Sequence, residues 1–226
     1  PIKSSAASDV YKRQAVEDDA LRQRFGEGRP MKDKMGVTLY QTKNCQLYAV
    51  RCGAGEIYAA AATQYLIDKY KVAAVLNYGV VGGCTDALHP GEICVVVKVA
   101  HYQYDLFAVD NVPAGRYLEY PDRLLPVSTA FTDLASPELH RVVCASGDKF
   151  VGDAAEKLWL HNEFGADICD MESAAILLTC DRNRVPCLII KAVADSLSGG
   201  AAEYWREKNQ TAKSCLDYAV EVIDGL

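Results

Sequence analysis

Short runs of apolar, often β-branched residues alternate along the chain with longer segments whose apolar positions recur at helical spacing. The apolar runs are nearly continuous, as expected of strands that are buried on both faces of a sheet. They lie at residues 46–53, 72–79, 92–100, 166–171 and 185–195. Helical patterns lie at 56–70, from about 152 to 164, at 172–183 and at 203–226. A further helix is expected near 137–144.

This alternation predicts one domain of the α/β class, because strands that alternate with helices build a largely parallel sheet covered on both faces. We predict a single-domain, three-layer α/β/α fold with a mostly parallel, twisted central mixed sheet over residues 15–226. The stretch from about 101 to 137 is long for a structureless connection and is expected to be functional or partly structured. Residues 1–14, PIKSSAASDVYKRQ, are polar and lack a strand period. We expect them to be a disordered tail or a segment that is not native to the protein.

Composition and charge exclude several classes of partner. The chain has 226 residues and a formal net charge of −6, which argues against binding nucleic acid through phosphate neutralisation. A membrane span needs about 20 consecutive apolar residues, and no run in the sequence approaches that length. The N-terminus has no apolar segment after its basic residues, as a secretory signal would require. We expect a cytoplasmic protein that binds neither nucleic acid nor membrane.

The nine cysteines form no C-x-x-C pair, and most lie inside apolar runs such as EICVVV and VPCLII. A free cysteine behaves as a small buried hydrophobe, and reduced thiols are the rule in the cytosol. The four histidines show no spacing typical of metal ligands. We expect neither a metal site nor another cofactor.

Two carboxylates stand at the ends of predicted strands, where ligands collect in open α/β sheets. Glu172 belongs to CDMES, residues 169–173, between a short strand and a helix, and Asp195 ends the strand 185–195. Acidic residues are also common at helix starts, with Asp170 as the N-cap and Glu172 favoured by the helix dipole. A purely structural role of the pentapeptide therefore stays open.

Lys191 lies four residues before Asp195 on the same strand, so both side chains are expected on one face. Its ammonium group, within LIIKAVAD, needs a partner because burying an unpaired charge is costly. Glu172 is the natural candidate, in a functional site or in a structural ion pair. The glycine-rich GVVGG at residues 79–83 would let a ligand approach the backbone closely, although it matches neither a Walker loop nor a G-x-G-x-x-G fingerprint.

The motifs NYGVVGG…HPGEICVV, SGDKFV, DMESAAI and VADS stand in the order and approximate spacing of the nucleoside phosphorylase and nucleosidase superfamily. The sequence most closely resembles the 5′-methylthioadenosine/S-adenosylhomocysteine nucleosidases, whose corresponding elements look like NTGSAGG…KVGDIVV, SGDxFI, EMEAxAI and ISD. The resemblance covers nearly everything from about residue 45 to 222. The Met-Glu pair followed by a strand that ends in Ser/Ala-Asp is a fairly specific signature of it.

The resemblance implies cleavage of the N-glycosidic bond of a purine nucleoside through a ribosyl cation-like transition state. At the position of Asp195 the family has a general acid that protonates N7 of the purine, which needs a carboxyl of raised pKa. Glu172 would accept hydrogen bonds from the ribose hydroxyls, and its charge suits the developing cation. Met171 would pack against the sugar. Phe150 would stack on the base, and the backbone of Val151 would read its edge.

The resemblance also implies further contacts with the substrate. Val80 and Gly82 of the glycine-rich loop would line the nucleoside site. Trp205 or Tyr204 would close it from the last helix.

Hydrolysis is favoured over phosphorolysis in this comparison. Phosphorylases of the superfamily commonly carry an arginine where Asn77 stands, and relatives often carry a serine at Val80, so a strong phosphate site is hard to build here. Nucleosidases hold the nucleophilic water with an arginine and an N-terminal glutamate. Lys191 stands at the arginine position without its bidentate fork. AVEDDAL resembles the family's AMEEEV and puts Asp19 at the position of the glutamate, with Asp18 as the alternative.

The resemblance thus predicts a purine nucleosidase of the methylthioadenosine/S-adenosylhomocysteine type, which would release adenine and serve methionine salvage. The alternatives are a phosphate-dependent purine nucleoside phosphorylase and a non-catalytic nucleoside-binding relative. The family's first strand, expected before Ala15, is missing from the pattern, so weak activity is expected. By the same resemblance a homodimer is expected, since family members form homodimers or higher oligomers, and the aromatic segment 101–107, HYQYDLF, is either a subunit contact or an ordinary loop.

Overall fold

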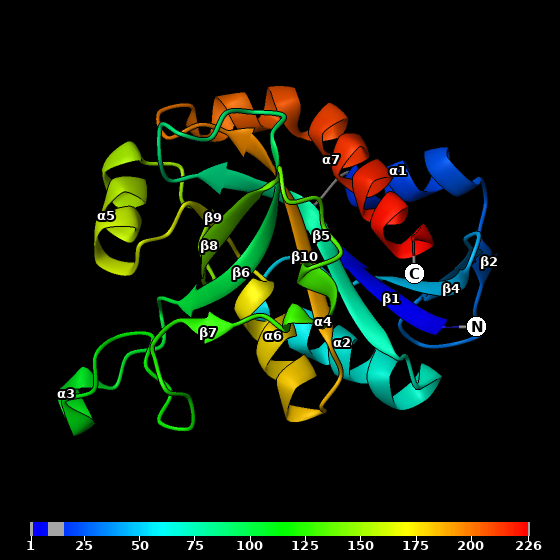
Figure 1. The fold of residues 1–226 in the computed structure, drawn as a ribbon, viewed down its shortest axis with the longest axis horizontal. Coiled ribbons are helices and arrows are strands. Elements are labelled where there is room, and N and C mark those ends of the chain that lie inside the picture. The colour runs from blue at the N-terminus through cyan, green and yellow to red at the C-terminus, as the bar shows by residue number, and fades with distance from the viewer. Residues whose placement is uncertain (1, 9–15, 226) are drawn as a thin grey trace.

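The computed structural model describes residues 2–8 and 16–225, which form one mixed sheet with helices on both faces (Figure 1). The strands are β1 (Ile2–Ser8), β2 (Arg29–Pro30), β3 (Thr38–Gln41), β4 (Cys45–Arg51), β5 (Ala74–Gly83), β6 (Ile93–His101), β7 (Leu125–Pro126), β8 (His140–Ser146), β9 (Ile168–Asp170) and β10 (Cys187–Asp195). The helices are α1 (Val16–Phe25), α2 (Glu56–Tyr70), α3 (Phe107–Asp110), α4 (Thr129–Thr132), α5 (Ala154–Phe164), α6 (Ser173–Arg182) and α7 (Gly200–Asp224).

Five of these strands close into a ring. β10 pairs with β5 in parallel, and the carboxyl end of β5 pairs with the short strand β9. β9 pairs with β8, β8 with β6, and β6 returns to β10. On the open side of the sheet, β1 lies beside the first half of β5, and β4, β3 and β2 follow outward. The prediction of a single-domain α/β/α fold with a mixed central sheet is confirmed.

Two pairs of helices cover the two faces. α7 packs on β5 and β10 with α1 beside it, whereas α2 and α6 pack together on the opposite face (Figure 1). The α2 sequence favours this burial because Ala59, Ala62 and Leu66 recur at helical spacing and are fully buried. No helix within the described residues is long and apolar enough to cross a membrane.

The N-terminal segment differs from the prediction made for it. Ile2–Ser8 form strand β1, which pairs in parallel with β4 along its whole length and with β5 through Ser4–Ala7. The prediction that the domain lacks its first strand is therefore wrong for these residues. Parallel pairing uses the N–H and C=O groups that any non-proline residue carries, so it does not require the apolar pattern that is absent here. The remainder of the predicted tail, residues 9–14, lies outside the described residues.

The connection between β6 and β8 is partly structured, as predicted for residues 101–137. It holds α3, β7 and α4, and its aromatic rings stack, with the centroids of Tyr104 and Tyr117 4.0 Å apart. The helix predicted near 137–144 is wrong, because His140–Ser146 form β8 between β6 and β9. A β-branched run this short is better satisfied by two neighbouring strands than by two turns of helix.

Candidate active site

The candidate site lies where the ring of strands closes. Asp195, the last residue of β10, pairs in register with Gly82 of β5 after a shift in the pairing beyond Val193. Gly82 pairs on its other side with Cys169 of β9. A Cβ atom at Gly82 would lie 3.3 Å from Asp195 Oδ2 and 3.1 Å from Cys169 Sγ. The absence of a side chain at Gly82 therefore leaves room for the groups of both neighbouring strands.

Asp195 carries an unusual carboxyl group. Its side chain is 1% exposed, and Lys157 Nζ donates to Oδ2 at 2.5 Å. Burial raises the pKa of Asp195 to about 6, against the lowering effect of Lys157. Within the described part of the chain, Oδ1 is buried and has no hydrogen-bond partner. An acid with this pKa and a free oxygen is suited to proton transfer near neutral pH.

Lys157 belongs to the candidate site, although it is not among the residues predicted from the sequence. It projects from α5, is 0% exposed, and donates a second hydrogen bond to the Ser196 carbonyl at 2.6 Å. α5 begins at Asp153, whose side chain accepts from the Glu156 N–H. A signal was present in the sequence, because Lys157 occupies the same helix face as the buried Leu160 and Phe164.

The CDMES segment ends β9 and begins α6, and its first carboxylate serves the fold. Asp170 Oδ1 accepts from the Ser173 N–H at 3.2 Å at the start of α6. Its Oδ2 forms an ion pair with Lys191 Nζ at 2.9 Å. Burial alone would raise the pKa of Asp170, but Lys191 and the Ser173 hydroxyl hold it below its ordinary value. The prediction of Asp170 as the N-cap is corrected, because Glu172 stands at the N-cap of α6, but Asp170 still serves the helix start through the Ser173 N–H.

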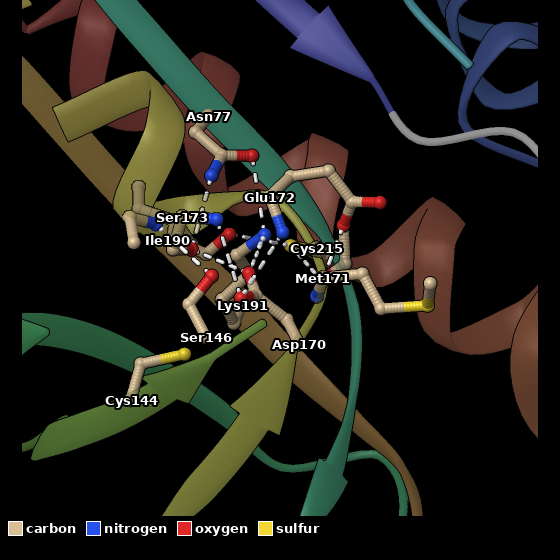
Figure 2. A network of polar contacts seen from close by, with 12 residues as sticks. Asn77, Cys144, Ser146, Asp170, Met171, Glu172, Ser173, Ile190, Lys191 and Cys215 are labelled. Carbon is tan, nitrogen blue, oxygen red and sulfur yellow. Dashed lines mark hydrogen bonds and ion pairs between the residues drawn. The ribbon is translucent and has the colours of Figure 1, made fainter. Parts of the chain in front are cut away.

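Lys191 is fully buried between two side chains (Figure 2). Besides Asp170, it donates to Asn77 Oδ1 at 3.1 Å, and Asn77 Nδ2 donates to Ser173 Oγ at 3.2 Å. The expectation that Lys191 pairs with Glu172 is corrected in favour of Asp170. Asp170 is the last residue of the short strand that borders β5, whereas the chain has already turned into α6 at Glu172.

Glu172 is directed away from the Lys191 pair (Figure 2). Its Oε1 accepts from the Gly55 N–H at 2.8 Å, and its Oε2 accepts from the Met171 N–H at 3.2 Å. Gly55 lies between β4 and α2 with φ +99°, and a Cβ atom there would lie 2.7 Å from Asp148 Oδ1. The buried Glu172 carboxylate thus fixes the loop before α2, while Met171 beside it is half-buried.

An aromatic cluster lies at the start of α7. The rings of Phe150 and Tyr204 meet edge to face at 5.4 Å, and Tyr204 meets Trp205 at 5.7 Å. Phe150 and Trp205 are partly exposed, whereas Val151 is buried. The buried Val80 of β5 lies in one apolar cluster with Ala194 and Ala212, against which Tyr204 packs. These predicted substrate residues are thus linked through Tyr204.

The N-terminal carboxylates are described only in part. Asp19 lies on α1 and is exposed. The side chain of its alternative, Asp18, lies outside the described residues. Within the described contacts, Asp19 has no hydrogen bond to the groups around Asp195, so its predicted role remains a prediction.

Comparison with known proteins identifies the family of the chain. The chain matches the model of the Phosphorylase superfamily over residues 16–225. It is 29% identical over 167 residues to an aminodeoxyfutalosine nucleosidase from Campylobacter jejuni, which covers 72% of each chain. It is 31% identical over 166 residues to a 5′-methylthioadenosine/S-adenosylhomocysteine nucleosidase from Shewanella piezotolerans, covering 70% of this chain and 71% of the relative.

The fold is also that of a solved nucleosidase. The 5′-methylthioadenosine/S-adenosyl homocysteine nucleosidase from Helicobacter pylori, complexed with a pyrrolo-pyrimidine derivative, has a TM-score of 0.89 at 21% identity. The similarity covers 100% of this chain and 99% of that one. These three proteins are named as nucleosidases, which supports the prediction of an N-glycosyl hydrolase. On the family match and the shared motifs, the chain belongs to the Phosphorylase superfamily.

Proposed function

We propose that this chain hydrolyses the N-glycosidic bond of a purine nucleoside, with Asp195 as the general acid. The observation that carries the proposal is the Asp195 carboxyl, which is buried, has its pKa raised to about 6, and keeps Oδ1 free of partners among the described residues. Proton transfer to N7 makes the departing purine neutral. General acid catalysis of this kind contributes about 10²–10⁴-fold to a rate.

Glu172 and Met171 are assigned to the sugar. The Glu172 carboxylate is held by two backbone N–H groups, from Gly55 and Met171. An ionised carboxylate accepts hydrogen bonds, and ribose hydroxyls can donate them. Its negative charge favours the cation that develops on the ribose during bond cleavage.

The base is assigned to the aromatic side of the site. Phe150 is partly exposed and braced edge-on by Tyr204, a geometry that leaves a ring face for stacking. Val151 follows it and offers its backbone to the base edge. Val80 and Gly82 on β5 then border the nucleoside, and Trp205, 55% exposed, covers it from α7.

Water is the proposed nucleophile, with Asp19 and Lys191 as the residues that orient it. Both assignments rest on the family resemblance, with Lys191 buried against Asp170 and Asn77 and Asp19 exposed on α1. Hydrolysis is favoured over phosphorolysis because the Lys191 charge is neutralised by Asp170, and the Asn77 amide is occupied by Lys191 and Ser173. These groups offer no uncompensated cation for phosphate.

The names of the relatives favour nucleosides with an enlarged 5′ group. Methylthioadenosine and S-adenosylhomocysteine are our first candidates, which would connect the chain to methionine salvage, and aminodeoxyfutalosine is the next. Release of the free base is to be measured for these three nucleosides, adenosine and inosine, each with and without inorganic phosphate. Strict dependence on phosphate would refute hydrolysis.

Two variants test the site within the same assay. Asp195→Asn should lose about 10²-fold or more of the rate while still binding nucleoside, because an amide cannot donate the catalytic proton. Glu172→Gln should weaken transition-state stabilisation by removing the charge. Asp68→Asn, on the exposed face of α2, is the matched control and should retain full activity. An Asp195→Asn variant with unchanged rate would refute the proposal.

We further propose that two copies of the chain form a homodimer. Large apolar side chains are exposed between β6 and β7, among them those of Phe107, Val109 and Leu118. Sedimentation velocity should give the mass of a dimer for the wild type. Val109→Asp should give a monomer, and a monomeric wild type would contradict the proposal.

A further inference from the structure

Lys157 is unusual because its charged side chain is buried. Its side chain is 0% exposed, and its ammonium group donates to Asp195 Oδ2 at 2.5 Å and to the Ser196 carbonyl at 2.6 Å. Burying an unpaired ammonium is costly, and a helix start such as that of α5 offers many solvent-facing positions for a lysine. The carboxylate that it contacts is the one we assign to proton transfer.

The residues around the Lys157–Asp195 pair hold both side chains in place. Lys157 shares the buried face of α5 with Leu160 and Phe164, which anchor the helix in an apolar cluster. A Cβ atom at Gly82 would lie 3.3 Å from both Lys157 Cε and Asp195 Oδ2. The lysine stem therefore passes directly over β5, through space that only a glycine leaves open.

Ser196, the residue after the acid, is held from two sides. Its carbonyl accepts from Lys157, while its N–H and hydroxyl both donate to Glu203 Oε2 at 2.6 Å. Glu203 lies on α7, so α5 and α7 together clamp the carboxyl end of β10. The clamp engages Asp195 through Oδ2 alone and leaves Oδ1 without a partner among the described residues.

Building on the proposed function, we propose that Lys157 is a positioning residue for the catalytic acid. It holds Oδ2 so that Oδ1 faces the departing purine, and it stabilises the carboxylate that remains after proton transfer. In the reaction the proton of Oδ1 moves to N7, and the C1′–N9 bond breaks with its electron pair passing to the base. Water adds its oxygen to C1′, and the proton that it loses balances the one that Asp195 gave.

Two charged groups act on the pKa of Asp195. Lys157 from α5 opposes the effect of burial and Glu203 from α7 reinforces it. The thiols of Cys84 and Cys169 are close by, and their hydrogen bond and burial raise the pKa of Cys84, which keeps that thiol neutral. Lys157 is thus the one cation acting on the acid among the described groups. An opposite charge at this distance lowers the pKa of an aspartate by about 1–3 units.

The test compares pH–rate profiles of nucleoside hydrolysis for the wild type, Lys157→Met and Lys157→Arg. In Lys157→Met, the limb on which activity falls with rising pH should move up by about 1–3 pH units. The kcat at low pH should fall by roughly 10²-fold, as expected when a catalytic group is misplaced. Lys157→Arg keeps the positive charge, so its activity should fall over the same pH range as that of the wild type. Its kcat should still fall, because the acid is misplaced. Lys149→Met, which removes an exposed cation paired with Glu156 at the same end of α5, is the control and should keep both values.

The outcomes separate this inference from the function on which it rests. If the wild type releases no base from any nucleoside, the proposed function fails. If the wild type is active and Lys157→Met keeps the wild-type limb, the inference is wrong, whether or not the melting temperature falls. Failure of both Lys157 variants to fold, judged by circular dichroism, would also count against it, since the lysine would then serve the fold.

Discussion

Replacing Lys191 with methionine tests the buried ion pair between Lys191 and Asp170 (Figure 2). Methionine has a similar length and no charge, so the change removes the ammonium without opening a large cavity. The Lys191 and Asp170 side chains are 0% and 2% exposed, and the variant leaves the Asp170 carboxylate buried without its cation. Removing one partner of such a pair costs about 3–5 kcal/mol.

The size of this loss in the Lys191→Met variant depends on the other contacts of Asp170 and Asn77. Asp170 keeps hydrogen bonds from the Ser173 hydroxyl and from the Ser173 and Glu172 N–H groups. Asn77 Oδ1 loses its donor, which adds about 1–3 kcal/mol for an unsatisfied buried acceptor. Because the retained bonds and the lost one act in opposite directions, we expect a loss of about 4 kcal/mol in the free energy of unfolding at neutral pH.

Asp170 should make the stability of the wild type and that of Lys191→Met respond to falling pH in opposite directions. In the wild type the pKa of Asp170 is lowered, so its contribution to stability is present above the ordinary pKa of about 3.9 and is lost as pH falls. In Lys191→Met, burial without the cation raises the pKa of Asp170. That variant should therefore gain stability as pH falls through the raised pKa.

Urea unfolding followed by circular dichroism at pH 7 and pH 5 measures both effects. The double variant Lys191→Met/Asp170→Asn removes both charges and is the matched control, expected to recover much of the loss. A single variant within about 1 kcal/mol of the wild type at pH 7 would refute the reasoning, since it would mean that the carboxylate needs no cation.

Three further predictions concern the site itself. The wild-type rate should fall as pH rises through about 6, because the protonated form of Asp195 is the proposed donor. A rate that is flat from pH 5 to 8 would contradict this. Gly82→Ala should lower kcat about 10-fold or more, because its Cβ atom would displace Lys157 and Asp195, and unchanged kinetics would show that the pair adapts. Gly55→Ala should cost about 1–3 kcal/mol in urea unfolding because of its φ of +99°, and should raise KM by disturbing Glu172; an unchanged KM would separate this loop from sugar binding.

The apolar pattern was sufficient to locate the strands that carry the site. The runs 46–53 and 185–195 correspond to β4 and β10, and Asp195 was identified as a strand end from the sequence. These strands are buried on both faces, so their composition reflects their environment directly. β1 could not be recognised from its pattern because serine and alanine dominate it, and the weak pattern of β8 was mistaken for a helix.

The pairing of charges could not be predicted from spacing. Asp170 and Glu172 are two residues apart across a turn into α6, and only the three-dimensional path decides which one meets Lys191. Lys157 was overlooked for a related reason. A lysine on a helix is ordinarily at the surface, and its contact with Asp195 spans 38 residues of sequence.

The closed ring of strands has a consequence for how this family member could diversify. β10 is hydrogen-bonded on both sides, to β6 through Ile190–Ala192 and to β5 as far as Asp195, so the strand that ends at Asp195 is held firmly in the sheet. Phe150, Tyr204 and Trp205 stand on a loop and a helix end outside the ring. The residues proposed to cover the base can therefore change in evolution while the proposed proton donor stays in the sheet, and substrate range and chemistry become separately adjustable.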